Sequence, residues 1–322
     1  MDPPARVTWQ IPVFAAGART VDVRDVIAAA LLRGELDGVI AAARAPVDGD
    51  VQALCDAWRY ERDLITAEET ERWLEARGLT LEEFDEFILR RSKDSDETVD
   101  LADPEAREKL RIELLLSGEF DRLALRLSWR FAAWLEAPAE PCEEDRRTAR
   151  LPRQWGCDER WLDEMLAVDA AWHRERDALL TPTALQQTLA TLRLPLTRLE
   201  FEALDLESLD AAREAFLCVR DDGLTIAEVA RDGGYTHSRV DALLEELSEE
   251  CQQHFLSAIP GSVLPPLVHG DGFQLCHLIK KSEPELADAR IRTRVEQQLI
   301  TQHFSELAAR HIRWLLFPPP AA

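Results

Sequence analysis

The fold is decided by the stretch Pro260-Gly261-Ser262-Val263-Leu264-Pro265-Pro266-Leu267-Val268, which Asp271-Gly272-Phe273-Gln274-Leu275-Cys276-His277-Leu278 follows closely. A Pro-Gly turn opens it, and prolines close its apolar run. Gly272 then reverses the chain into a segment with alternating apolar residues. Turn residues placed around such runs predict the closing hairpin of a small sheet.

Length and composition describe a globular and largely helical protein. The chain has 322 residues, and a domain usually takes roughly 100 to 200 residues, so two or three domains are expected. Hydrophobic residues make up 46% of the sequence and charged residues 31%, with nine Trp and only 13 Gly. This balance excludes disordered and fibrous proteins.

Charge and cysteine usage limit the partners. The net charge of -23 repels phosphate backbones and anionic lipid, so neither nucleic acid nor membrane is expected as a partner. No run approaches the ~20 apolar residues of a membrane span, and the first residues lack the pattern of a secretion signal, which predicts a cytoplasmic location. The six cysteines form no Cys-x-x-Cys pair, so we expect reduced thiols, no metal and no cofactor.

An internal repeat organises the first two thirds of the chain. The Trp-centred segment 56–66 resembles segment 169–181, and the helix end at 31–37 resembles the one at 115–121. Two matches in the same order predict a duplicated helical module. A long helix from Pro104 to Leu135 is expected between the Trp-centred segments.

Capping boxes mark helix starts in the first copy. Thr66 with Glu69 and Thr80 with Glu83 have the spacing in which a hydroxyl and a carboxylate satisfy helix amides reciprocally. Gly78 is placed to end the first of these two helices. The segment is predicted to be a helix-turn-helix bundle.

The remaining third changes pattern. Residues 198–205 alternate as a strand does, residues 210–220 form a helix, and Thr225 with Glu228 caps another helix. A helix is expected over Val240–Ala258, before the closing hairpin. One further helix is predicted over Pro284–Trp314, and Phe317-Pro318-Pro319-Pro320 cannot continue it.

These segments resemble the parvulin-type (PpiC/SurA-like) family of peptidyl-prolyl isomerases and chaperones. Gly261, Pro266 and Gly272 fall in register with the closing strands of a parvulin domain, and "WLEARGLTLEEF" resembles the helical arm that precedes such domains. The resemblance implies an α+β, mostly α fold, in which a duplicated helical chaperone-arm module joins a small parvulin-like α/β domain with an antiparallel sheet and a long C-terminal helix. The expected domains are residues 1–103, 104–195 and 196–283, with a helix and Pro-rich tail at 284–322 returning to the helical part.

The resemblance also implies a site. The family's isomerases place a His on the first strand, a Cys or Asp on the middle segment and a His on the last strand, around an apolar floor. Here the first strand has no His, and Gln274 stands at the last pocket His, so the catalytic residues stay unknown, with Gln274 and Cys276 as candidates. Predicted peptide-binding residues are Phe255, Leu256, Phe273, Gln274 and Cys276.

Three functions follow from these patterns. The first is a non-catalytic or weakly catalytic chaperone that holds a peptide or unfolded client, such as a precursor peptide, since cytosolic proteins of this type resemble those that accompany bacterial peptide-maturation systems. The second is an active prolyl isomerase with a rebuilt pocket, because amide rotation needs only preferential binding of the twisted amide. The third is a helix-turn-helix DNA-binding regulator over Leu224–Leu247, which the net charge opposes.

Overall fold

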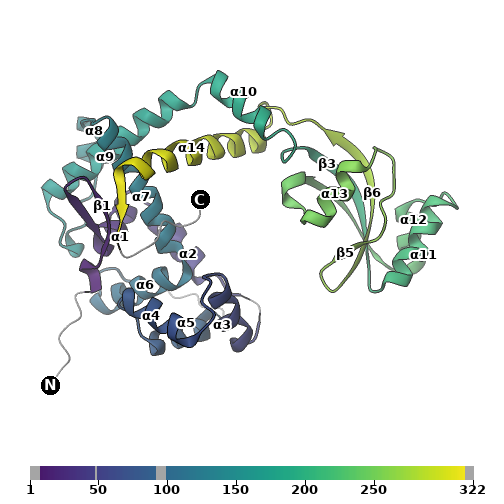
Figure 1. Ribbon diagram of the computed structural model, residues 1–322, viewed down its shortest axis with the longest axis horizontal. Coiled ribbons are helices and arrows are strands. Elements are labelled where there is room, and N and C mark those ends of the chain that lie inside the picture. The colour runs from purple at the N-terminus through teal and green to yellow at the C-terminus, as the bar shows by residue number, and fades with distance from the viewer. Residues whose placement is uncertain (1–7, 48, 92–98, 316–322) are drawn as a thin grey trace. The chain divides into compact units, whose positions relative to one another are not determined.

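Helices account for most of the described residues, which also form two small antiparallel sheets (Figure 1). The structure is a computed structural model that describes residues 8–47, 49–91 and 99–315. The α+β, mostly α fold class predicted from the sequence is confirmed. The predicted Pro-rich tail lies outside the described residues.

The chain divides into two units, residues 1–178 with 301–322 (unit 1) and residues 179–300 (unit 2). Unit 1 contains the helices α1 (Val23–Leu32), α2 (Leu36–Arg44), α3 (Val51–Tyr60), α4 (Ala67–Ala76), α5 (Leu81–Arg91), α6 (Pro104–Ser117), α7 (Glu119–Glu136), α8 (Glu143–Thr148) and all but the last residue of α9 (Glu159–Leu179), with the 3-10 turns η1 (Thr8–Gln10) and η2 (Arg153–Trp155). The domain boundaries drawn from the sequence stay a prediction.

Local sequence signals explain how the helices of unit 1 begin and end. Thr66 and Thr80 each accept a hydrogen bond from the backbone N–H three residues on, while Glu69 and Glu83 accept from the threonine N–H groups, so both predicted capping boxes are confirmed. The segment predicted as one helix over Pro104–Leu135 is two helices. Gly118 between them has φ 84°, a left-handed conformation that a helix interior does not contain.

A three-stranded sheet, in the order β2-β1-β7, was not predicted. It joins β1 (Pro12–Ala16) and β2 (Arg19–Asp22) to β7 (Ile312–Trp314). The predicted helix over Pro284–Trp314 is therefore wrong at both ends. Helix α14 runs over Ala289–His311, and the next three residues pair with β1 instead of continuing the helix.

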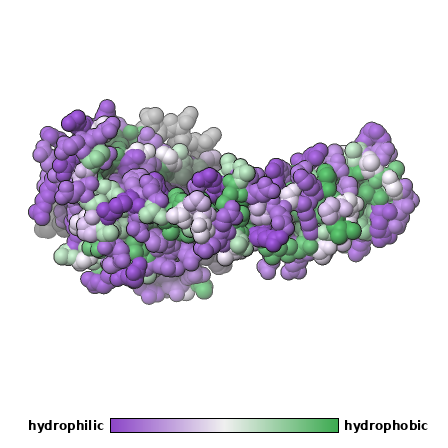
Figure 2. Space-filling model, turned by 90° about the horizontal axis from the view of Figure 1, so that it is seen from above, coloured by the Kyte–Doolittle hydropathy of each residue, from purple (hydrophilic) through white to green (hydrophobic). Residues whose placement is uncertain are grey.

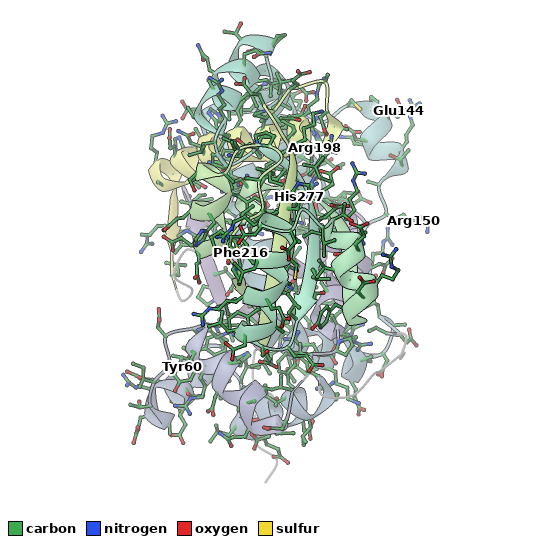
Figure 3. All side chains as sticks on the ribbon, turned by 90° about the vertical axis from the view of Figure 1, so that its right-hand side faces the viewer. Tyr60, Glu144, Arg150, Arg198, Phe216 and His277 are labelled. Atoms are coloured by element: carbon green, nitrogen blue, oxygen red, sulfur yellow. The ribbon has the colours of Figure 1, made fainter. Side chains whose placement is uncertain are left out.

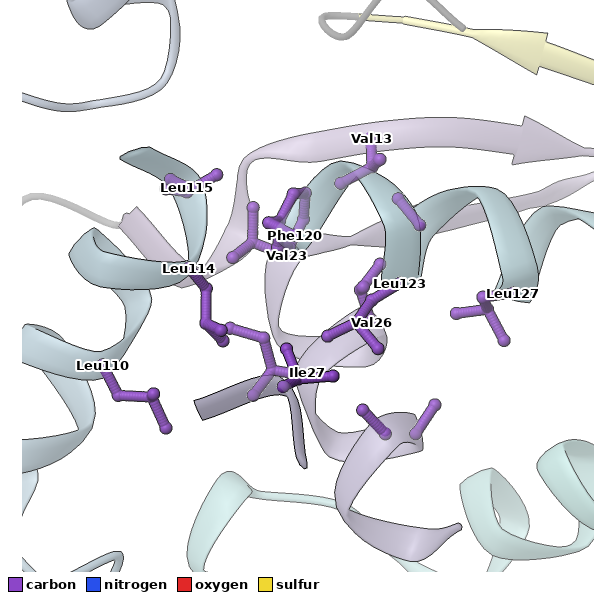
Figure 4. Packing of buried hydrophobic residues seen from close by; sticks show 14 of the residues in the cluster. Val13, Val23, Val26, Ile27, Leu110, Leu114, Leu115, Phe120, Leu123 and Leu127 are labelled. Carbon is purple, nitrogen blue, oxygen red and sulfur yellow. The ribbon is translucent and has the colours of Figure 1, made fainter. Parts of the chain in front are cut away.

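The core of unit 1 is formed by helices packed against this sheet. Figure 4 shows Val13 from β1, Val26 and Ile27 from α1, and Phe120 and Leu123 from α7 gathered in one cluster. The end of α14 adds Phe304, whose ring lies near those of Trp129 and Trp172, at centroid distances of 6.4 and 5.9 Å.

Unit 2 contains a four-stranded sheet in the order β4-β3-β6-β5. Its elements are α10 (Pro182–Thr191), β3 (Arg198–Leu206), α11 (Leu209–Arg220), α12 (Ile226–Gly233), β4 (Thr236–Leu243), the 3-10 turn η3 (Leu244–Glu246), α13 (Glu249–Ser257), β5 (Leu267–His269), β6 (Gly272–Ser282) and the first half of α14. Strands β5 and β6 are the predicted closing hairpin, and β3 is the predicted alternating strand.

The helix predicted over Val240–Ala258 is wrong in its first part and correct over α13 (Glu249–Ser257). Residues Val240–Leu243 belong to β4, which pairs with β3 from Arg198↔Leu243 to Asp205↔Thr236. This pairing also removes the helix-turn-helix hypothesis for Leu224–Leu247. The segment that would have to be the recognition helix is a strand at the edge of the sheet, so it cannot present a helix to a DNA groove.

Each face of the sheet in unit 2 is covered by different helices (Figure 1). On one face, which we call the Phe255 face, α13 packs Phe255 onto Phe201, with a centroid distance of 4.7 Å. On the other, the α11 face, Leu204, Leu206 and Leu275 pack under α11 and α12. Among the described helices, none is long and apolar enough to cross a membrane.

Candidate functional site

The five predicted peptide-binding residues are divided between the two faces of the sheet. Phe255 and Cys276 are buried together on the Phe255 face, with exposed fractions of 1% each. Leu256, the next residue of α13, is exposed. Phe273 packs with the cluster on the α11 face because it lies an odd number of residues from Cys276 along β6.

Gln274 and Cys276 form a short hydrogen-bonded chain at one end of the Phe255 face. The Cys276 thiol donates to Gln274 Oε1 at 3.4 Å, and Gln274 Nε2 donates to Asp205 Oδ1 at 2.8 Å. Burial raises the pKa of the Cys276 thiol to about 12. The thiol therefore stays protonated near neutral pH, which excludes it as a nucleophile.

Histidine is absent from the buried cluster of the Phe255 face as far as the structure describes it. The β3 residues that point into it are Leu199, Phe201 and Ala203, all apolar. On the opposite, α11 face of the sheet, His237 and His277 flank Glu202, with nitrogen–oxygen distances of 3.6 and 3.3 Å. Figure 3 labels His277 on the sheet, along with Arg198.

A hollow of about 570 Å³, which we call the Phe255 hollow, opens at the other end of the Phe255 face. Its floor contains Leu199, Leu244 and Phe255, which are buried. Leu194 and Leu256 line it too, and they are 57% and 43% exposed. Gln274, Cys276 and Phe273 do not line this hollow. In Figure 2 the surface of unit 2 is mostly hydrophilic, with separate hydrophobic patches.

Polar side chains hold the walls of the Phe255 hollow in place. Lys281 Nζ donates to the carbonyl oxygens of Leu256 and Ala258, at 3.0 and 2.7 Å, and so satisfies acceptors at the end of α13. Arg193 forms an ion pair with Glu283 across the same hollow.

Sequence reasoning found Phe255 and Leu256 but missed the rest of this hollow. The other walls come from residues 190–197, before β3, and residues 281–283, at the end of β6. A signal for the first segment was present: Leu192, Leu194 and Leu196 alternate with polar residues and a proline, yet Leu194 remains exposed. No group of three or more His, Cys, Asp and Glu within the described ranges could hold a metal ion.

Comparisons with known proteins give structural likeness only. No protein-family model and no curated protein matches the chain. Among solved structures, the foldase protein PrsA from Streptococcus pneumoniae is 13% identical with a TM-score of 0.33, covering 93% of this chain and 91% of that one. The peptidylprolyl isomerase PrsA from Bacillus anthracis is 10% identical with a TM-score of 0.29, over 87% and 94% of the two chains.

A third match comes from work on PEB4 and Cj1289, described as SurA-like chaperones of Campylobacter jejuni. It is 9% identical with a TM-score of 0.22, and covers 94% of this chain and 98% of that one. Identities and TM-scores are low throughout. A function therefore has to rest on this chain's own residues.

Proposed function

We propose that this chain is a parvulin-like, chaperone-type protein that holds an extended apolar segment of a client peptide in the Phe255 hollow. The observation that carries the proposal is a hollow of about 570 Å³ with a buried aromatic floor and two leucines left exposed beside it. Sites of this volume with apolar walls and a few polar groups are typical of ligand binding. The net charge of -23 favours neutral or cationic clients.

Holding is favoured over rapid isomerisation by the chemistry of the Phe255 face. An isomerase must bind the twisted amide better than the planar one, which takes hydrogen-bonding groups placed at the amide. Here the amide group of Gln274 already donates to Asp205, and the protonated thiol of Cys276 is directed to Gln274. These two candidate catalytic groups are satisfied by each other and by Asp205.

The test combines binding and prolyl isomerisation on one panel of Xaa-Pro and apolar peptides. We expect binding without acceleration of isomerisation. Leu256→Asp should weaken binding at least tenfold, because it places a charge beside the apolar floor. Leu217→Asp is the matched control, since Leu217 is 47% exposed on α11 and lines no part of the hollow.

Three results would contradict the proposal. Equal losses in the two variants would show that exposed leucines act without regard to position, and unchanged binding in Leu256→Asp would remove the hollow as the site. Acceleration that disappears in Gln274 or Cys276 variants would establish the isomerase instead.

A cytoplasmic location and a precursor peptide of a maturation pathway as client belong to the same proposal, and both rest on sequence alone. Cell fractionation followed by detection of the full chain tests the location. Titration with precursor peptides encoded beside the gene tests the client, with scrambled peptides of equal composition as the control.

A further inference from the structure

Unit 1 has a hollow of its own, of about 780 Å³, which we call the Arg33 hollow. It is enclosed by the end of α1, by α8 with the segment that leads to η2, and by one side of α9. Its lining residues include the apolar Leu31, Leu151 and Leu166, and the charged Arg33, Arg150 and Asp169. All of them belong to unit 1, so this hollow is separate from the site proposed above.

Arg33 has an unsatisfied donor at this hollow. Its Nε donates to both carboxylate oxygens of Asp169, at 2.9 and 3.1 Å, and its side chain is only 10% exposed. Nη2 of the same guanidinium is buried and has no hydrogen-bond partner in the structure. Buried donors in proteins are usually paired, so an acceptor on a ligand at this hollow would satisfy Nη2.

The charges that line the hollow balance in number, Arg33 and Arg150 against Asp145 and Asp169, but one of the two arginines is left without an ion pair among the described residues. Asp169 is shared, because Arg130 Nε lies 3.0 Å from the oxygen that Arg33 also uses. Arg130 is paired in addition with Glu35 at 3.2 Å. Arg150, which also lines the hollow and is labelled in Figure 3, is exposed and has no ion pair in the described chain.

Two other titratable groups face the hollow. Asp145 accepts from the backbone N–H of Cys142 at 3.3 Å and so is used in capping α8. Burial lowers the pKa of His173, which keeps its imidazole neutral near neutral pH. Neither group supplies the acceptor that Arg33 lacks.

We propose that the Arg33 hollow binds a ligand in which a carboxylate adjoins an apolar group. The carboxylate accepts hydrogen bonds from Arg33 Nη2 and pairs with Arg150, and the apolar group lies against Leu31, Leu151 and Leu166. Guanidinium groups suit carboxylates because their planar donors match the two oxygens. The free C-terminus of an apolar peptide and a medium-chain carboxylic acid share this chemistry.

Calorimetric titration of the full chain tests the proposal with three probes: N-acetyl-leucyl-leucine, its C-terminal amide, and decanoate. We expect binding of at least one acid, and at least tenfold weaker binding of the amide than of the free dipeptide if the dipeptide is the ligand. A preference for the dipeptide over decanoate identifies a peptide terminus as the source, and the reverse identifies a fatty acid.

Variants separate charge from shape. Arg150→Ala should weaken acid binding several-fold, whereas the matched Arg147→Ala should not, because Arg147 is exposed on α8 but does not line the hollow. Arg33→Lys keeps the charge but removes the planar fork, and Ala170→Phe fills the hollow from α9; both should abolish binding. If the Arg33 variant fails to fold, the comparison of Arg150→Ala with Arg147→Ala and the comparison of the dipeptide with its amide still test the proposal.

The proposal is overturned if neither acid binds, if the dipeptide is the acid that binds and its amide binds equally well, or if Arg147→Ala weakens acid binding as much as Arg150→Ala. None of these outcomes tests the proposed function, because the Phe255 hollow and the Leu256 and Leu217 variants that test it lie in unit 2.

Discussion

The two units bury different kinds of side chain. In unit 1 the buried residues include Asp25, Thr70, Arg77, Arg111, Glu113, Ser128 and Arg130. Among the described residues of unit 2, every buried side chain is apolar or a cysteine. Polar partners that must meet in one geometry therefore help to specify unit 1, whereas strand register and apolar packing specify unit 2.

Asp25→Ala should have the largest effect on stability. Asp25 is fully buried and accepts from Arg19 Nη2 and from Trp161 Nε1, both at 2.9 Å. Removing one partner of a buried pair leaves the others unpaired, so we expect a loss of about 3 to 5 kcal/mol in the free energy of unfolding. Asp205→Ala in unit 2, an exposed acceptor of Gln274, should cost about 1 kcal/mol or less.

Denaturant unfolding with hydrogen exchange resolved by peptide measures both variants. Loss of protection should be confined to residues of unit 1 for Asp25→Ala. Similar losses for the two variants would show that buried polar groups do not distinguish the units.

Gly118→Ala sharpens the comparison within unit 1, where a turn conformation joins α6 to α7. An alanine at φ 84° costs about 1 to 2 kcal/mol. Its control is Gly38→Ala in α2, where an added Cβ meets no atom within 4 Å and alanine should gain up to about 1 kcal/mol. The midpoint temperature of thermal unfolding should fall in Gly118→Ala and rise in Gly38→Ala. A rise in both variants would show that alanine is not strained at position 118.

Thr225→Ala tests the start of helix α12 in unit 2, which the local capping sequence determines. Thr225 accepts from the Glu228 N–H at 3.2 Å, and loss of such a cap costs about 1 kcal/mol. Hydrogen bonds from the backbone and side chain of Thr225 lower the pKa of Glu228. Ionised Glu228 therefore stabilises the folded chain fully above the ordinary Glu pKa, and this stabilisation is lost as the pH falls through the lowered pKa of Glu228.

Amide exchange of α12 at pH 7 and at a pH below the lowered Glu228 pKa measures this effect. Acid should weaken protection of α12 in the natural chain, and less so in Thr225→Ala. The same acid response in both would mean that the capping box contributes nothing to the helix.

The smallest perturbation is thiol alkylation, which leaves the fold intact. At pH 8 the exposed Cys142 should react with iodoacetamide, while Cys276 should not until the chain is denatured, because burial both covers it and raises its pKa to about 12. Mass spectrometry of the labelled peptides gives the result. Comparable native rates at the two positions would show that the Phe255 face opens readily.

Sequence reasoning succeeded where a structure is determined within a few residues. The capping boxes at Thr66, Thr80 and Thr225 and the hairpin around Gly272 all depend on short-range contacts. In the two segments matched as a repeat, Gly34 and Gly118 each adopt a left-handed conformation between consecutive helices. Duplication of the whole module stays a prediction.

It failed where distant segments decide. The pattern of segment Val240–Leu243 suits one face of a helix as well as a strand. Pairing with β3 selects the strand. Ile312 and Trp314 continue a helical pattern until β1 offers them a partner. The Phe255 hollow is formed by four separate segments, so sequence reasoning could name Phe255 and Leu256 of α13 but not the residues that the other three segments contribute.

Strand β7 has a consequence for how the chain folds as it is made. The ribosome releases β1 before any residue of unit 2, whereas β7 emerges only after every residue of unit 2. Through most of translation the edge of β1 that β7 will occupy stays unpaired, while all four strands of unit 2 become available together. Unit 2 can thus be complete first, and unit 1, part of which precedes unit 2 along the sequence, is the last to close.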